Sequence, residues 1–222
     1  MSVFADLVEQ LAELLQPVFH ASAAAAAIVL FTALVRLLVH PLSRAAARGQ
    51  KARVALQPKV AELRERYARN PERLQRAVLE LHAREKVSPL AGCLPGLLQL
   101  PAFFLLYHLF SSPTIGGETN TLLTHQLFDA PLGGRWLDAL SGGGGLVYLG
   151  LFVVVIAVAV VNFRRTAVMT AAADGVPGAV GKVMPYMSFF TLVTVAVVPL
   201  AAALYVVTST AWSTVERVLL YR

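Results

Sequence analysis

The chain has 222 residues, of which 57% are hydrophobic and 14% are charged, and its mean hydropathy is +0.65. Soluble domains are typically about 45–50% apolar and about 25% charged, so this composition excludes an ordinary water-soluble globule and a disordered chain. A single cysteine excludes a disulfide framework and a multi-cysteine zinc site. The net charge of +6 would indicate nucleic acid in a soluble protein. In a membrane protein, the position of the basic residues matters more than their sum.

The first seventeen residues predict an amphipathic helix. Apolar residues recur there at helical spacing: Val3, Phe4, Leu7, Val8, Leu11, Leu14 and Leu15. The same stretch contains acidic residues and no basic residue, whereas a cleavable signal peptide begins with positive charge, so we expect none. We expect residues 1–17 to lie on the outer membrane surface, with a soluble cap as the alternative.

Five apolar segments are predicted to cross a membrane, because each approaches the roughly 20 apolar residues that a spanning helix needs. Their approximate bounds are residues 21–40, 90–110, 146–163, 183–198 and 200–217. The last two share one uncharged run between Lys182 and Glu216, which as a single helix would be about 50 Å long. Pro199 lies in the middle of that run, where a proline breaks or kinks a helix. The expected fold class is therefore an all-α polytopic membrane protein with one core domain over residues 18–222.

The basic residues are distributed unevenly over the segments that connect these spans. Seventeen lie on one side, in a segment at 43–88, a loop at 164–182 and the tail, whereas a loop at 111–145 on the other side contains only Arg135. The positive-inside rule then places the N-terminus outside and the C-terminus in the cytoplasm. Four spans would leave the basic tail outside, so five spans fit better.

Residues 43–88 form the one long polar stretch, and their pattern predicts a cytoplasmic helical hairpin. Asn70 and Pro71 are typical of an N-cap and a first helical position, and Pro58 is expected to kink or interrupt the helix before them. Twelve basic and five acidic residues make the hairpin basic. This charge favours attraction to anionic lipid, or docking of a ribosome, a targeting factor or a nascent chain. Specific nucleic-acid readout is not expected, because the segment has no aromatic platform and no recognised module.

Arg36 is the main candidate functional residue, because an ionised residue within a membrane span is costly and by default marks a site. The alternative is snorkelling to the headgroups, since Arg36 lies near the cytoplasmic end of its span. Apart from Glu216, which ends the uncharged run of the last span, the five spans contain no Asp or Glu, so we expect Arg36 to have no internal counter-ion and to face a wet cavity open to the cytoplasm. Thr32 lies one turn earlier on the same helix face. Other polar residues of the spans either line this cavity or make interhelical hydrogen bonds: Gln99, Tyr107, Ser188, Thr191, Thr194, Tyr205, Thr208 and Ser209.

Patterns typical of catalysis or metal binding are weak. The five histidines are scattered without metal-ligand spacing, and the spans show none of the acidic pair, Ser–His pair or zinc motif that an intramembrane protease needs. Gly142–Gly145 lacks the Gly-Lys-Ser/Thr of a phosphate-binding loop and is expected to be a flexible part of the outer loop. We therefore expect no enzymatic activity, no metal and no cofactor.

A highly specific string lies at residues 85–107: Glu85-Lys86-Val87-Ser88-Pro89-Leu90-Ala91-Gly92-Cys93-Leu94-Pro95, followed by Gln99, Pro101, Phe103 and Leu106-Tyr107. It resembles a conserved region of the YidC/Oxa/Alb membrane-protein insertases. The segment 32–36, followed by Pro41-Leu42, is similar to the first core helix of that family, and Pro199 with Leu204-Tyr205 is similar to its last helical hairpin. The resemblance covers the chain in the order that the family has.

This resemblance implies five core helices around a hydrophilic groove that is closed to the outside and open to the cytoplasm and to lipid. It also implies a cytoplasmic hairpin after the first core helix and an outer amphipathic helix before it. In the family, a groove arginine receives the hydrophilic part of a nascent membrane protein. By residue match this role falls on Arg36, with Thr32, Gln99 and Tyr205 as further groove residues.

The function implied by the resemblance is that of a membrane protein insertase and chaperone, which releases apolar helices laterally into the bilayer. The partners expected are nascent membrane proteins and membrane lipids, with the ribosome, the signal recognition particle and a Sec translocon as further candidates. Many relatives have a basic C-terminal tail, whereas this sequence stops at Arg222, so cytoplasmic contacts are expected from residues 43–88 and 164–182. A composition rich in Ala and Arg, without a transit peptide, favours a bacterial plasma membrane. A small anion transporter or channel, and a structural membrane-assembly subunit, stay open as alternatives.

Overall fold

The computed structural model describes residues 2–88, 104, 107–109, 112–115, 117–142, 144–171 and 182–220. Its elements in chain order are α1 (Ser2–Phe19), η1 (His20–Ser22), α2 (Ala23–Ala55), α3 (Gln57–Arg66), α4 (Pro71–Arg84), β1 (Thr114–Ile115), β2 (Glu118–Thr119), η3 (Thr121–Thr124), β3 (Gln126–Leu127), β4 (Ala130–Pro131), α6 (Trp136–Gly142), α7 (Gly145–Ala171), η4 (Met184–Phe189), α9 (Phe190–Val197) and α10 (Leu200–Leu220). Most of the predicted span at 90–110, and residues 172–181 of the predicted loop, lie outside the described residues.

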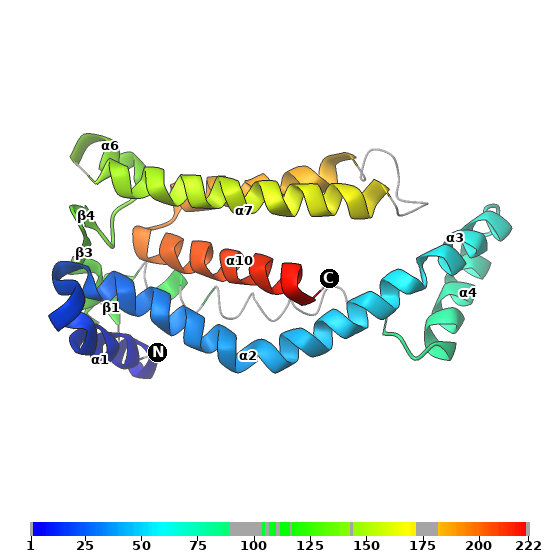
Figure 1. Ribbon diagram of the computed structural model, residues 1–222, viewed down its shortest axis with the longest axis horizontal. Helices are drawn as coiled ribbons and strands as arrows, with labels where there is room; N and C mark the ends of the chain where they lie inside the picture. The colour runs from blue at the N-terminus through cyan, green and yellow to red at the C-terminus, as the bar shows by residue number, and fades with distance from the viewer. Residues whose placement is uncertain are drawn as a thin grey trace.

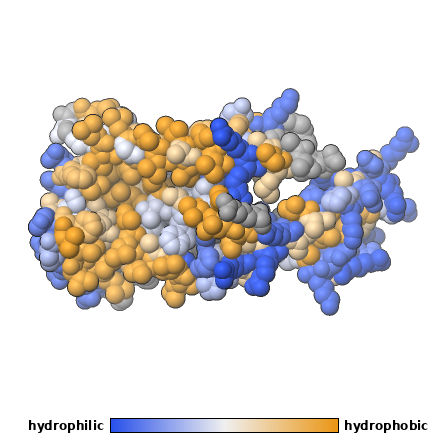
Figure 2. Space-filling view, viewed as in Figure 1, coloured by the Kyte–Doolittle hydropathy of each residue, from blue (hydrophilic) through white to orange (hydrophobic). Residues whose placement is uncertain are grey.

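Three long helices, α2, α10 and α7, lie side by side along the molecule, with α10 between the other two (Figure 1). The central position of α10 explains why every residue from Leu200 to Tyr205 is buried. The outward faces of α2 and α7 expose large apolar side chains, such as Leu38 and Leu146, and Figure 2 shows a largely apolar surface over this part of the molecule. The segments Asp6–Ala52 and Gly145–Thr170 contain helices long and apolar enough to cross a membrane. The presence of five spans stays a prediction.

Helix α2 is longer than the predicted first span, because it continues past Pro41 for a total of 33 residues, about 50 Å. It ends just before a turn at Leu56, and Pro58 follows in the first turn of α3. The interruption predicted at Pro58 is therefore confirmed. Asn70 caps α4, because its Oδ1 accepts a hydrogen bond from the Arg73 amide at 3.0 Å, which confirms the predicted N-cap. Helices α3 and α4 project at one end of the molecule, where the surface is hydrophilic (Figures 1 and 2).

The opposite end of the molecule is formed by α1, the start of α2 and two small antiparallel sheets, β1–β2 and β3–β4. Helix α1 packs along α2 and buries Val8. Gly144 has φ +78°, and a Cβ added to it would lie 2.7 Å from the Cβ of Ala130. This close packing differs from the flexible loop predicted for Gly142–Gly145: Gly142 ends α6 and Gly145 begins α7.

The segment between the sheets and α6 also anchors the start of α10. The amides of Leu200 and Ala201 donate to the carbonyl oxygens of Gly134 at 2.8 Å and Leu132 at 2.9 Å. The first amides of a helix have no partners within the helix, so these bonds satisfy groups that burial would otherwise make costly. The break predicted at Pro199 is present, with α9 ending at residue 197 and α10 beginning at residue 200.

Candidate functional site

Polar side chains lie on one face of the otherwise apolar middle of α2. Thr32, Arg36 and His40 follow one another at intervals of four residues, so they line up along one side of the helix. Leu34 and Leu38, on other faces, are 50% and 80% exposed. Helix α2 therefore has one face with exposed apolar side chains and another face with polar side chains. Arg36 and His40 lie on the polar face, and both contact α10.

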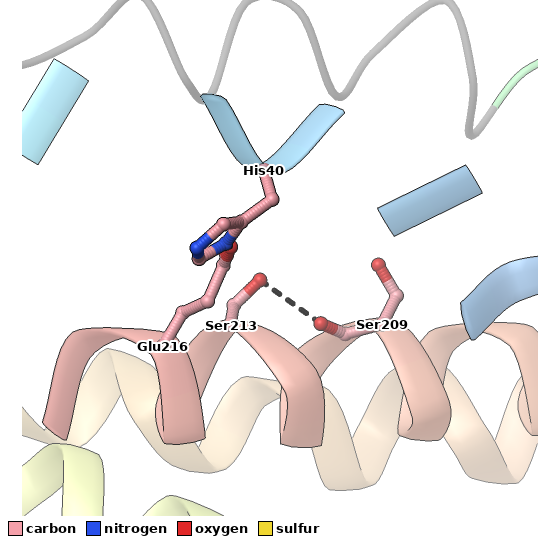
Figure 3. Close-up of polar contacts among 4 residues, drawn as sticks. All are labelled: His40, Ser209, Ser213 and Glu216. Atoms are coloured by element: carbon pink, nitrogen blue, oxygen red, sulfur yellow. Dashed lines mark hydrogen bonds and ion pairs between the residues drawn. The ribbon is translucent and has the colours of Figure 1, made fainter. Parts of the chain in front are cut away.

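Helix α10 contributes a matching set of polar side chains. Tyr205, Ser209 and Glu216 are each less than a tenth exposed, and Ser213 lies between the last two (Figure 3). These groups are buried because α10 lies between α2 and α7. Burial of polar groups is costly unless they find hydrogen-bond partners, so the α2–α10 contact has to supply them.

Two side-chain contacts join the two helices. Arg36 donates from Nη2 to Ser209 Oγ, and one turn further along α2 the His40 Nδ1 contacts the Glu216 Oε1 (Figure 3). The side chains of His40 and Glu216 are 33% and 11% exposed, so the pair lies at the margin of the buried region. The Arg36 guanidinium also interacts electrostatically with Tyr205 and Glu216. We define the polar row as Thr32, Arg36, His40, Tyr205, Ser209 and Glu216.

Some hydroxyl groups near these contacts bond within their own helix. Thr32 Oγ1 donates to the Ile28 carbonyl at 2.7 Å, and Ser213 Oγ donates to the Ser209 carbonyl at 2.9 Å (Figure 3). The long side chains of Arg36 and His40 instead reach across to α10. Over the described parts of the chain, no group of three or more His, Cys, Asp or Glu residues could hold a metal ion.

The structure places three of the four predicted groove residues on the facing sides of α2 and α10: Arg36, Thr32 and Tyr205. Gln99 lies outside the described residues. The sequence predicts no internal counter-ion for Arg36. In the structure Glu216 interacts with Arg36 electrostatically, while the Glu216 carboxylate contacts His40. His40 and Glu216 are absent from the predicted set. Their spacing from Arg36 and Ser209, four and seven residues, does put each on the same helix face as its neighbour.

Beyond His40 the same face of α2 becomes strongly basic and lines a cavity. Arg44, Arg48 and Lys51 continue the helical spacing of Arg36 and His40. A cavity of about 510 Å³ is lined by these three residues together with Pro41, Ala47 and Leu220. Leu220 is the last residue of α10, so the cavity lies where α10 ends, on the side of the α3–α4 hairpin (Figure 1). Guanidinium and ammonium groups gathered in one cavity attract carboxylates and phosphates.

These features define a class of protein: a mostly helical chain with helices long and apolar enough to cross a membrane, and with a partly buried, charged row between two long helices. Residues 15–222 match the sequence model of the family described as 60Kd inner membrane protein, and the chain belongs to this family. The family predicted from the string at residues 85–107 is thereby confirmed.

Several relatives named membrane protein insertase YidC are similar to this chain. The protein from Clostridium perfringens is 40% identical over 87 residues, which are 39% of this chain and 37% of the relative. The protein from Geobacter sulfurreducens is 41% identical over 81 residues, 36% of this chain and 15% of the relative. The protein from Shewanella woodyi is 45% identical over 82 residues, 37% of this chain and 15% of the relative. The matched part of this chain thus covers between 15% and 37% of the length of these three relatives.

Proposed function

We propose that this chain is a membrane protein insertase with an intramembrane groove that is open to the cytoplasm. The groove receives hydrophilic segments of nascent membrane proteins, and the apolar helices of these proteins leave sideways into the bilayer. Arg36, Thr32, Gln99 and Tyr205 are groove residues in this proposal, with Arg36 as the charged contact. Membership of the family over residues 15–222 and the similarity to proteins named membrane protein insertase YidC support it.

The physical need for such a groove is the cost of moving polar groups across a bilayer. About 30 Å of hydrocarbon offers no hydrogen-bond partners to the moving segment. A groove with polar walls shortens the apolar path, and Arg36 attracts Asp or Glu side chains more strongly in a partly buried site than in water. Burial of the substrate's apolar helix in lipid, at about 25 cal/mol per Å², then draws it out of the groove. The scheme breaks no covalent bond and uses no cofactor.

The observation that carries this proposal is the placement of Arg36. Its half-buried side chain donates to Ser209 across the α2–α10 contact, whereas a snorkelling side chain extends towards the headgroups. From Arg36 the row continues through His40 to the cavity lined by Arg44 and Arg48. Basic side chains therefore follow α2 from its hairpin end to its apolar middle, which suits the reception of acidic segments.

The proposed topology has five membrane-spanning helices in the plasma membrane of a bacterium, with the N-terminus outside and the C-terminus in the cytoplasm. Helix α1 lies on the outer surface, and the α3–α4 hairpin projects into the cytoplasm. The proposed partners are nascent membrane proteins and anionic lipids, with the ribosome, the signal recognition particle and a Sec translocon docking at the basic hairpin. The hydrophilic surface of the projecting hairpin supports this arrangement (Figure 2).

The test is insertion of a single-span substrate by the full chain reconstituted in liposomes. Two versions of the substrate differ only in the translocated tail, where Asp and Glu of the first are replaced by Asn and Gln in the second. We expect Arg36→Ala to lower insertion of the acidic version on the order of tenfold, the effect of losing about 1.4 kcal/mol, and to leave the neutral version unchanged. Arg36→Lys is expected to retain part of the activity, because it keeps the charge but loses the planar set of donors.

Thr210→Val provides the matched control on the neighbouring helix. The Thr210 hydroxyl donates to the Val206 carbonyl at 2.6 Å, and Thr210 lines a small pocket that includes residues of α7. This variant is expected to insert both versions like the wild type. Equal insertion of the acidic version by the wild type and by Arg36→Ala would contradict the electrostatic part of the proposal. Anion flux through the same liposomes without substrate would favour the transporter alternative.

A further inference from the structure

We infer that His40 is a positioning residue that keeps the Glu216 carboxylate from neutralising Arg36, and so sets the preference of the groove for acidic segments. The inference rests on the proposed function and concerns the same site. In this inference, the His40–Glu216 pair influences the choice of the substrates that Arg36 attracts.

The first observation is the order of the contacts along the two helices. Helices α2 and α10 run in the same direction (Figure 1). Arg36 contacts Ser209, and His40, about 6 Å further along α2, contacts Glu216, about 10 Å further along α10. Figure 3 shows the His40 imidazole reaching from α2 to the carboxylate of Glu216. His40 thus holds this carboxylate on the hairpin side of Arg36.

The second observation is that Glu216 acts on Arg36. The two side chains interact electrostatically, and the side chain of Glu216 is only 11% exposed, so water screens the interaction weakly. A carboxylate within the same molecule has a high effective concentration at its target. Without another partner, Glu216 would compete with the Asp or Glu of a substrate for the Arg36 guanidinium. The contact with His40 reduces this competition.

The charged surroundings of the pair agree with this role. Arg217, next to Glu216 on α10, acts electrostatically on Arg36 as a like charge. Arg44, one turn beyond His40, lines the basic cavity. A carboxylate released by His40 would therefore meet several cations. Arg36 is half-buried whereas Arg44 and Arg217 are exposed, so water screens the attraction of the carboxylate to Arg36 least. Removal of His40 is therefore expected to lower the insertion of acidic substrates. Removal of the Glu216 charge is not expected to lower it.

The experiment uses the acidic and neutral versions of the substrate described above, with insertion expressed per folded, monodisperse protein. His40→Leu is expected to lower insertion of the acidic version roughly three- to tenfold and to leave the neutral version unchanged. Glu216→Gln is expected to insert the acidic version at least as well as the wild type. The double variant His40→Leu/Glu216→Gln is expected to return to the Glu216→Gln level. His40→Gln, which keeps a donor for the carboxylate, is expected to stay close to the wild type.

A second cycle separates this role from a purely structural one. In an Arg36→Ala background, His40→Leu is expected to have no further effect on the acidic version, because the site of competition is gone. A structural defect would instead lower the insertion of both versions of the substrate in either background. Ser213→Ala is the matched control on α10, because the Ser213 hydroxyl bonds to its own helix, and it is expected to resemble the wild type.

The outcomes also distinguish this inference from the proposed function. If Arg36→Ala loses the preference for acidic tails while His40→Leu keeps it, the inference is overturned and the proposed function stands. Equal losses of both substrate versions in His40→Leu, or no recovery in the double variant, overturn the inference as well. If Arg36→Ala keeps the preference for acidic tails, the electrostatic part of the proposed function and this inference fall together.

Discussion

At the scale of single residues, Gly144 is constrained twice. Its φ of +78° lies in the left-handed region, and an added Cβ would approach the Ala130 Cβ to 2.7 Å. We expect Gly144→Ala to lower the free energy of unfolding by at least about 1–2 kcal/mol, the cost of the backbone conformation alone. Thermal unfolding in detergent measures the effect. Gly142→Ala is the matched control, because a Cβ there meets nothing within 4 Å, and an equal loss in both variants would contradict this explanation.

The residues of the site illustrate what the sequence can and cannot predict at this scale. Arg36 is predictable because one charge in an apolar run is costly and therefore conspicuous. Glu216 and His40 are not, because each lies at the boundary of an apolar run, where charge is ordinary. Their contact depends on the register between α2 and α10, which are about 170 residues apart in sequence. Pairing at that distance is set by tertiary packing, which spacing along one helix does not determine.

At the scale of elements, the cap of α4 is a local feature that can be tested by itself. Asn70 Oδ1 accepts a hydrogen bond from the Arg73 amide, and loss of such a cap typically costs about 1 kcal/mol. The free energy of local opening is then smaller by the same amount. We therefore expect Asn70→Ala to speed hydrogen exchange in the first turn of α4 roughly fivefold. Asn70→Asp keeps the acceptor and is the control. Unchanged exchange at Arg73 in Asn70→Ala would contradict the importance of the cap.

The prolines show why helix ends were harder to predict than helix presence. Pro58 and Pro71 lie in the first turns of α3 and α4, where a missing amide costs little. Pro199 follows Val198, which is extended with ψ 157°, so α9 and α10 are separate. Pro41, by contrast, lies inside α2. A proline removes one backbone hydrogen bond, and α2 gains other support from its packing against α1 and α10.

At the scale of the whole molecule, the distribution of polar and apolar surface is that expected of a membrane protein, whereas the number of spans stays a prediction. The hairpin end is hydrophilic and the middle exposes apolar side chains (Figure 2). Hydropathy and charge predict this pattern, because they depend on composition summed over long segments. The segment that contains the two small sheets could not be predicted from hydropathy and charge. Its bonds to Leu200 and Ala201 come from short turns that have no periodicity to detect.

Membrane topology is the prediction that belongs to this scale, and single cysteines can test it in a Cys93→Ser background. Thr124 and Arg76 are exposed residues in η3, next to the two small sheets, and in the hairpin, and Leu219, near the end of α10, is 63% exposed. With the N-terminus outside and five spans, an impermeant maleimide labels Thr124→Cys on intact cells. It labels Arg76→Cys and Leu219→Cys only after permeabilisation, because both then lie in the cytoplasm. Four spans would instead expose Leu219→Cys on intact cells, because the chain after the last span would end outside, against the positive-inside rule.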